Sequence, residues 1–390
     1  MSEAIVIIGS GLAGITVARE LRRIDRDLPV VIVTADDGGF YSKPSLSNAL
    51  AAGKNAAQLL LTPPAQLASQ LGVELRVHTR VERILPAERL LQTSAGPLPY
   101  RKLVLAQGAM PIRLPLRGDG AGRVLSVNNL ADYAAFRDAL DGKTRVARVA
   151  ILGAGLIGCE FANDLRAAGI AVDVFDLAPQ PLGRLLPPRA AAFFRDRLES
   201  AGVRFHLSTG STEVWEEGSG FRLFDGQGGQ HSADLVLSAV GLQPAVELAQ
   251  AAGLAVGRGI RVDRTLASSG PDIHALGDCA EIDGRVLPFV MPIMQAARAL
   301  AKTLAGDPTE VGYPAMPVVV KTPACPAVVC PPPADAQGSW REEADEGGKG
   351  GEGGIKALFE DASGTALGFA LVGEAVREKQ ALAARMPAWL

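Results

Sequence analysis

Two glycine-rich motifs of the form Gly-x-Gly-x-x-Gly are the residues of this sequence with the clearest chemical meaning. The first spans residues 9–14 after the apolar stretch 4–8, and the second spans residues 153–158 after the stretch 149–152. Between a strand and a helix, such glycines form a tight turn and let the backbone approach a pyrophosphate at the helix N-terminus. One such motif is a weak signal, but two in the same context predict two dinucleotide sites in one chain.

Acidic residues near the ends of the following strands could bind the ribose of each dinucleotide. An acid about 20 residues beyond the glycines accepts a hydrogen bond from a ribose hydroxyl, and Asp176 stands 18 residues after the second motif. A 2′-phosphate would meet like charge there, and no basic residue follows before Arg184, so we expect NADH rather than NADPH. Asp36 fits less well, and we expect backbone groups of Thr34 and Ala35 to hold the other ribose. For both acids, a solvated turn residue is the alternative interpretation.

The composition excludes several classes of protein. The 390 residues, 48% hydrophobic and 21% charged, fit a globular α/β protein with two or three domains. A formal net charge of −3 gives no general attraction for nucleic acid. No apolar run reaches about 18 residues, so we expect no transmembrane helix, and we expect no signal or transit peptide. The four cysteines lack Cys-x-x-Cys spacing, which fits a cytoplasmic protein.

Two strand–helix–strand units, at residues 1–35 and about 145–177, must position the glycine motifs. Residues 111–122 are rich in proline and glycine, and residues 241–244 contain a glycine and a proline that interrupt regular secondary structure. We expect the chain to cross between domains at these two places. The sequence thus predicts an α/β fold with two Rossmann-like domains and a small α+β C-terminal domain. The predicted domains are residues 1–112 with 245–312, residues 113–244, and residues 313–390.

The segment of about 335–354 contains a run of glycines and has little apolar surface to bury. We therefore expect a flexible, solvent-exposed loop between two strands of the C-terminal domain. A regulatory or docking loop is the alternative interpretation.

A third motif completes the pattern, because the stretch 273–278 ends in Gly277 and Asp278. Together with the two glycine motifs and the stretch 106–108, it resembles the FAD-dependent pyridine nucleotide oxidoreductases, over nearly the whole chain. The resemblance implies a glutathione-reductase-like fold, in which the first motif binds FAD and Asp278 binds the ribityl chain of FAD. It further implies that residues 113–244 form the NAD-binding domain, inserted into a discontinuous FAD-binding domain.

The cysteines distinguish between members of that family. Its disulfide reductases carry a pair of redox cysteines beside the flavin, whereas here no cysteine precedes Cys159, and Cys279 also stands alone. We therefore expect no dithiol relay. Cys325 and Cys330 have the spacing of a redox pair but lie in the wrong part of the chain. We interpret them as packing thiols, with a redox or metal role as the alternative.

In place of the cysteine pair stands the stretch 41–47, which contains Lys43. It is similar to the segment that brings a lysine to the flavin in reductases that serve rubredoxins and oxygenase ferredoxins. The resemblance implies that Lys43 pairs with Glu160, and these two are the catalytic candidates. An ammonium favours negative charge on the reduced ring, and a carboxylate keeps the lysine oriented. The alternative is a surface lysine and a glutamate near a helix N-terminus.

The motifs and the resemblance together assign two groups of binding residues. The FAD group consists of Gly9, Ser10, Gly11, Leu12, Ala13, Gly14, Thr34, Ala35, Lys43, Val81, Gly108, Glu160, Asp278, Val290 and Lys321. The NAD group consists of Gly153, Gly155, Leu156, Ile157, Gly158, Asp176 and Gly241. We expect a helix from Val290 to about residue 304, with its N-terminus facing the flavin and stabilising negative charge there.

Several longer stretches, among them 155–165 and 320–326, resemble the bacterial rubredoxin–NAD reductases. The resemblance implies a cytoplasmic, monomeric enzyme that passes electrons from NADH through FAD to rubredoxin. One alternative is a reductase for an oxygenase ferredoxin or a flavorubredoxin. Another is a flavoprotein whose NADH-bound state is recognised by a binding partner. Two downstream pathways, alkane hydroxylation and oxygen detoxification, stay open.

Overall fold

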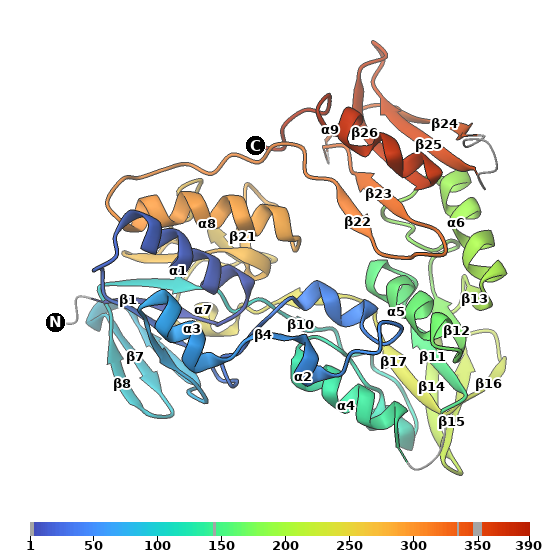
Figure 1. Ribbon diagram of the computed structural model, residues 1–390, viewed down its shortest axis with the longest axis horizontal. Coiled ribbons are helices and arrows are strands. Elements are labelled where there is room, and N and C mark those ends of the chain that lie inside the picture. Colours follow the sequence, from blue (N-terminus) through green and yellow to red (C-terminus); the bar gives the residue numbers. More distant parts are fainter. Residues whose placement is uncertain (1–3, 143–145, 334, 346–352) are drawn as a thin grey trace.

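A parallel five-stranded sheet carries the first glycine motif (Figure 1). The computed structural model describes residues 4–142, 146–333, 335–345 and 353–390. The strand order is β20-β9-β1-β2-β5, and all neighbouring strands are parallel. In that order the strands are Ile273–Ala275, Lys102–Leu105, Ile5–Ile8, Val30–Val33 and Glu74–Arg76. The central strands β1 and β2 are apolar and buried along their whole length, as parallel strands covered on both faces require.

Helices α1 (Leu12–Ile24) and α8 (Val290–Leu304) pack against each other beside this sheet (Figure 1). The helix predicted to begin at Val290 is thereby confirmed. A three-stranded antiparallel sheet, which the sequence analysis did not predict, is also part of this unit; its strands are β6 (Val81–Leu85), β7 (Leu90–Thr93) and β8 (Gly96–Pro99). Because β20 comes from the second stretch of chain, residues far apart in sequence complete one sheet. The predicted domain boundaries themselves stay a prediction.

A second parallel sheet, of order β13-β12-β11-β17, carries the second glycine motif. Its strands are Val203–Leu207, Ala171–Asp176, Arg148–Leu152 and Leu235–Ser238. The helices of this unit are α4 (Leu130–Leu140), α5 (Leu156–Ala167) and α6 (Pro188–Ser200). An antiparallel pair, β10 (Ala109–Pro111) with β18 (Leu242–Pro244), joins the two units near the predicted crossing points.

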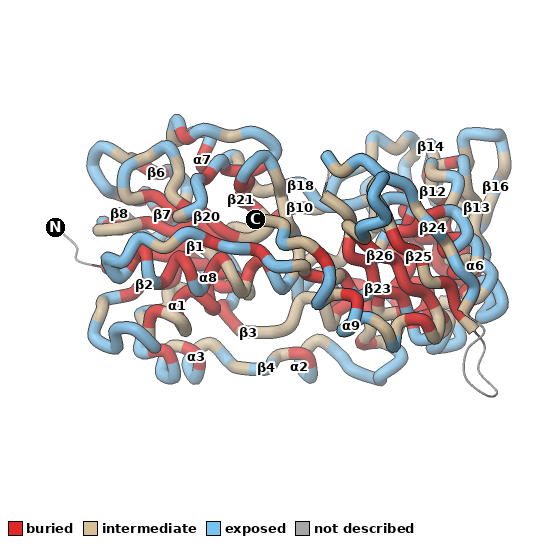
Figure 2. The backbone as a smooth tube through the Cα atoms, turned by 90° about the horizontal axis from the view of Figure 1, so that it is seen from above, coloured by how far each residue is buried: buried red, intermediate tan, exposed pale blue. Residues whose placement is uncertain are grey.

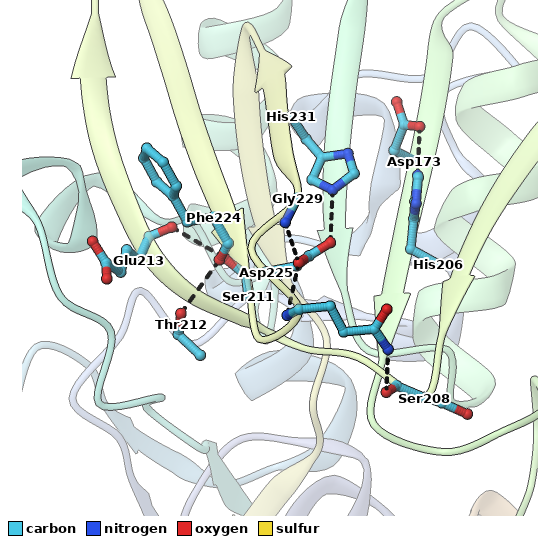
Figure 3. Close-up of polar contacts among 11 residues, drawn as sticks. Asp173, His206, Ser208, Ser211, Thr212, Glu213, Phe224, Asp225, Gly229 and His231 are labelled. Carbon is cyan, nitrogen blue, oxygen red and sulfur yellow. Dashed lines mark hydrogen bonds and ion pairs between the residues drawn. The ribbon is translucent and has the colours of Figure 1, made fainter.

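A polar cluster ties this sheet to an antiparallel sheet formed by β14 (Ser211–Glu217), β15 (Gly220–Asp225) and β16 (Gln230–Ala233) (Figure 3). His206 Nε2 lies 3.0 Å from Asp173 Oδ1, and His231 Nε2 lies 2.9 Å from Asp225 Oδ2. The two imidazole rings are 4.6 Å apart. Among the described residues, no group of His, Cys, Asp or Glu is arranged to hold a metal ion, so we regard the cluster as a cross-link between sheets.

The C-terminal unit is an antiparallel sheet of order β22-β23-β26-β25-β24. Its strands are Val318–Val320, Ala327–Cys330, Ala366–Gly373, Gly354–Glu360 and Ser339–Asp345. It is followed by η5 (Glu374–Glu378) and α9 (Lys379–Ala383). The predicted fold class, two Rossmann-like units and a small α+β unit, is confirmed.

The flexible loop expected at 335–354 is partly wrong, because β24 occupies Ser339–Asp345 and pairs along its length with β25. Trp340 packs edge-on against Phe359, with ring centroids 5.5 Å apart. Arg341 Nη2 lies 2.8 Å from the Glu360 carboxylate. These cross-strand contacts hold a strand whose composition resembles a loop. Residues 346–352 of the expected loop lie outside the described residues.

Among the described residues, the buried apolar side chains form four hydrophobic clusters, and the two largest extend through the three units, where the buried backbone is red in Figure 2. The first sheet and its helices form one of these two cores. The second parallel sheet and its helices, the nucleotide unit, share the other with the C-terminal sheet and with Leu46, Ala49 and Leu59 of the first unit. In the shared core, Phe194 of α6 belongs to the same buried cluster as Ala357 and Val372. Glu342 of β24 accepts hydrogen bonds from the backbone N–H of Arg189 and Ala190, at 3.2 and 2.7 Å, and so caps α6 from another unit.

Shorter elements complete the structure. They are β3 (Phe40–Tyr41), η1 (Lys43–Asn48), α2 (Ala56–Leu59), β4 (Leu60–Thr62), α3 (Pro64–Leu71), η2 (Pro86–Glu88), η3 (Asp119–Arg123), α7 (Glu247–Ala251), β19 (Ile260–Val262), η4 (Gly277–Cys279) and β21 (Ala280–Ile282). None of the helices in the described part of the chain has the length and apolar character needed to span a bilayer.

Candidate functional site

The first glycine turn has a crowded base and an open middle. A Cβ atom at Gly9 would lie 2.3 Å from the carbonyl oxygen of Ala106, and one at Gly14 would lie 2.1 Å from the carbonyl oxygen of Gly9. Gly9 also has φ +113°, a conformation that L-residues rarely adopt. Gly11, by contrast, has nothing within 4 Å of its Cβ direction. The outer glycines thus serve packing, and the middle one leaves a surface that a phosphate could approach.

Asp36 lies closer to this turn than the sequence analysis expected. Its Oδ1 accepts hydrogen bonds from Thr34 Oγ1 at 2.6 Å and from Ser10 Oγ at 3.1 Å. The backbone N–H of Gly38 donates to the same oxygen at 3.0 Å. The carboxylate therefore connects the turn to the end of β2, whereas the expectation about its fit to a ribose stays a prediction. An acid three residues beyond a buried strand is the signal in the sequence for this link.

The second glycine turn repeats the arrangement. A Cβ atom at Gly158 would lie 1.9 Å from the carbonyl oxygen of Gly153, whereas Gly155 has nothing within 4 Å. Asp176 stands beside this turn: its Oδ2 accepts from the N–H of Ala154 at 2.6 Å, and its Oδ1 accepts from the N–H of Ala178 at 2.7 Å. The carboxylate thus holds the turn in place, and its contact with a ribose stays a prediction.

Gly277 and Asp278 bring a carboxylate to the start of α1. A Cβ atom at Gly277 would lie 3.0 Å from the Cβ of Ala13, so these two segments touch. Burial raises the pKa of Asp278, and the charge of Lys43 opposes that shift. Burial lowers the pKa of Lys43, and the charges of Asp278 and Asp132 oppose that shift. Lys43 and Asp278 therefore influence each other across one partly buried space.

Glu160 is fully buried, and its ion pair is formed with Lys321, with Nζ 2.9 Å from Oε2. The backbone N–H of Lys321 donates to Oε1 at 2.8 Å, and Ser47 Oγ donates to Oε2 at 2.5 Å. The Lys43–Glu160 pair expected from the sequence is thus corrected to Lys321–Glu160 in the described part of the chain. The reason is packing, because the end of β22 brings Lys321 within hydrogen-bond distance of Glu160 on α5.

The four cysteines are free and buried. Burial raises the pKa of Cys279, Cys325 and Cys330 to about 11 and raises that of Cys159 further. A thiol acts as a nucleophile in its ionised form, so this burial disfavours nucleophilic reactivity of the four side chains. The expectation that the enzyme has no dithiol relay stays a prediction.

The other predicted site residues lie around the two turns. Gly108 has φ +71° and open space beside it, and Val290 is 41% exposed at the N-terminus of α8. Ile157 is 40% exposed at the start of α5. Leu12, Val81 and Leu156 are the first residues of α1, β6 and α5, and Gly241 directly precedes β18.

The residues at the first turn fit FAD. The open middle glycine suits a pyrophosphate, and the partly buried Asp278 is an acceptor for sugar hydroxyls. Gln107 supplies a third observation, because its Oε1 is buried and has no hydrogen-bond partner among the described residues. Buried polar atoms without a partner are rare, and a bound ligand is one explanation. The second turn has the donor set and open surface for a second dinucleotide.

Comparisons with known proteins extend this description. Residues 3–302 match the family described as pyridine nucleotide-disulphide oxidoreductase, and residues 310–386 match the rubredoxin binding C-terminal domain. The rubredoxin-NAD(+) reductase of Alcanivorax borkumensis is 46% identical over 385 residues, which is 98% of each chain. That of Acinetobacter baylyi is 47% identical over 375 residues, 95% of this chain and 94% of its own. A ferredoxin reductase structure from Rhodopseudomonas palustris has a TM-score of 0.87 at 28% identity, covering 99% and 96% of the two chains.

Proposed function

The chain belongs to the pyridine nucleotide-disulphide oxidoreductase family, and from this membership we propose that it is an FAD-dependent rubredoxin–NAD(+) reductase. It takes electrons from NADH and delivers them to rubredoxin. One observation carries the proposal: a reductase unit with two dinucleotide turns is followed by residues 310–386, which match a rubredoxin-binding domain. Relatives named for the same reaction are similar over almost the whole chain.

When bound, FAD can accept two electrons from NADH and release them singly, as an iron carrier that takes one electron at a time requires. The chain itself supplies binding and orientation. The turn at Gly11 and the carboxylate of Asp278 would hold FAD, with Asp36 supporting the turn. The turn at Gly155 would hold the pyrophosphate of NADH, and Asp176 would bind its ribose.

Lysine ammonium groups are the electrostatic contribution that we assign to the protein. Lys43 and Lys321 both lie in the partly buried region between the units, and a nearby cation favours negative charge on a reduced flavin. Glu160 keeps Lys321 oriented through the 2.9 Å ion pair. We therefore assign the charge to both lysines and the orienting role to Glu160.

We further propose that the enzyme is monomeric and acts in the cytoplasm. Free thiols at all four cysteines are compatible with a reducing compartment. Sedimentation of the purified, FAD-loaded protein would test the oligomeric state. A stable dimer would contradict that part of the proposal.

The experiment that tests the function is steady-state oxidation of NADH with a series of purified iron carriers. The series contains rubredoxin, an oxygenase ferredoxin and the rubredoxin-like domain of a flavorubredoxin. We expect the highest kcat/KM with rubredoxin, and higher kcat/KM with NADH than with NADPH. Saturable reduction of another carrier with no measurable reduction of rubredoxin would contradict the proposal.

A further inference from the structure

A groove of about 390 Å³ opens between residues 42–61 and Lys321. Pro44 of η1 and Leu61 of β4 are among the residues that line it. Among the described lining residues, the only charged ones are Lys54 and Lys321. Leu61 is 61% exposed, which is high for a large apolar side chain. The groove therefore combines an uncovered apolar contact with positive charge.

One wall of this groove is formed by residues 42–61 and the other by Lys321, and helix α5 of the nucleotide unit binds both. Asp164 is buried, and its two carboxylate oxygens accept from the N–H groups of Leu50 and Ala51, each at 2.9 Å. One turn earlier, Glu160 binds Ser47 of the same wall and Lys321 of the other. Residues four apart share one face of a helix, so a single face fixes the separation of the two walls.

Helix α4 fixes the position of Lys54 in a similar way. The hydroxyl of Tyr133 donates to the carbonyl oxygen of Lys54 at 2.9 Å, and Arg137 Nη1 donates to it at 3.1 Å. The side chain of Lys54 is exposed, and no ion pair to it is present in the described part of the chain. A fixed backbone thus presents an ammonium to solvent at the edge of the groove. The other cation, Lys321, is already bound to Glu160.

We propose that this groove is the docking site for the electron acceptor, and that it receives an acidic surface of rubredoxin. This inference rests on the proposed function. Lys321, which lines the groove, lies within the stretch 310–386 that matches a rubredoxin-binding domain. Lys54 attracts the acidic partner and orients it, and Leu61 supplies the apolar contact at short range. Charges at the edge of an interface mainly accelerate association, and apolar contacts mainly slow dissociation.

The test is charge reversal at Lys54 in the FAD-loaded enzyme. At low ionic strength, we expect Lys54→Glu to lower kcat/KM for rubredoxin by about tenfold, and the loss should shrink as salt screens the charge. The rate of flavin reduction by NADH, measured by stopped flow, should not change. Lys302→Glu, which reverses an exposed charge on the last turn of α8, is the matched control and should behave as the wild type.

A second variant separates the two contributions. Leu61→Ser should raise the KM for rubredoxin several-fold without salt dependence, because it removes apolar contact and no charge. Unchanged rubredoxin kinetics in both Lys54→Glu and Leu61→Ser, with rubredoxin still reduced by the wild type, would overturn the docking site alone. A wild-type enzyme that does not reduce rubredoxin would overturn the proposed function instead. FAD content and Tm of each variant show that the fold is retained.

Discussion

Removing Lys321 should destabilise the protein more than removing Glu160, although the two side chains form one ion pair. The reason is unequal burial, since the Glu160 side chain is 0% exposed and that of Lys321 is 35% exposed. In Lys321→Met the Glu160 carboxylate stays buried without a counter-charge. In Glu160→Gln the ammonium of Lys321 can turn to water and keep its bond to the carbonyl oxygen of Pro44.

The magnitudes follow from the hydrogen bonds that remain. Breaking a buried ion pair from one side costs about 3–5 kcal/mol. In Lys321→Met, Ser47 and the backbone N–H of residue 321 still donate to the carboxylate, so we expect a loss of about 2–4 kcal/mol in the free energy of unfolding. For Glu160→Gln, which leaves no buried charge, we expect a loss of about 1–2 kcal/mol. The double variant should cost less than the sum by about 1–2 kcal/mol.

The assay is equilibrium unfolding in urea, followed by circular dichroism, for the four members of the cycle. FAD must be held at one concentration, because a ligand that binds only the folded state raises apparent stability. The same series without added FAD separates loss of cofactor from loss of the contact. Strictly additive effects, or a larger loss in Glu160→Gln than in Lys321→Met, would refute the reasoning. Either result would mean that Glu160 does not depend on Lys321 for its counter-charge.

Three further predictions concern other parts of the chain. Asp176→Ala should raise the KM for NADH, because the N–H groups of Ala154 and Ala178 lose the acceptor that holds the turn. It should also narrow the preference over NADPH, because the negative charge that would repel a 2′-phosphate is removed. Equal wild-type kcat/KM for both nucleotides would contradict the assignment. Replacing all four cysteines with alanine should leave rubredoxin reduction within about threefold, and a loss above ~100-fold with FAD bound, about 2.7 kcal/mol in the barrier, would indicate a thiol in the mechanism. Burial lowers the pKa of His274, so the folded state resists its protonation, and stability should fall as pH drops below the unfolded value of about 6.5. His274→Leu should flatten that part of the pH profile of unfolding free energy, whereas an unchanged slope would assign the acid sensitivity to other groups.

Features that depend on neighbouring residues could be predicted from the sequence. The two glycine turns follow from a short apolar strand and three glycines, and the start of α8 at Val290 follows from the proline two residues later. Asp176 lies beside its turn as the spacing implies. In each of these cases the determining contacts lie within about 25 residues, a range over which strand–turn–helix geometry fixes relative positions.

Features that depend on packing between distant segments could not be predicted. Lys43 and Lys321 are chemically equivalent partners for Glu160, and only the placement of β22 against α5, 161 residues away in sequence, decides between them. Asp164 lies in a stretch that the sequence analysis quoted, yet its partners at residues 50 and 51 gave no local signal. Strand β24 was missed because edge strands carry charged side chains on both faces, which makes them resemble loops.

The core shared by the nucleotide and C-terminal units limits how the enzyme can be re-engineered. A chimera that exchanges only the C-terminal unit for that of another reductase would place foreign side chains against Phe194 and leave the start of α6 without the carboxylate of Glu342. Helix α6 therefore packs against both the nucleotide unit and the C-terminal unit, and must match the residues of both. A recombination point at the β10–β18 connection keeps α6 together with the C-terminal unit, although Leu46, Ala49 and Leu59 of the first unit still pack in the shared core. Acceptor specificity should therefore transfer between homologues only when the nucleotide unit and residues 42–61 accompany the C-terminal unit, because the proposed docking groove is lined by that stretch and Lys321.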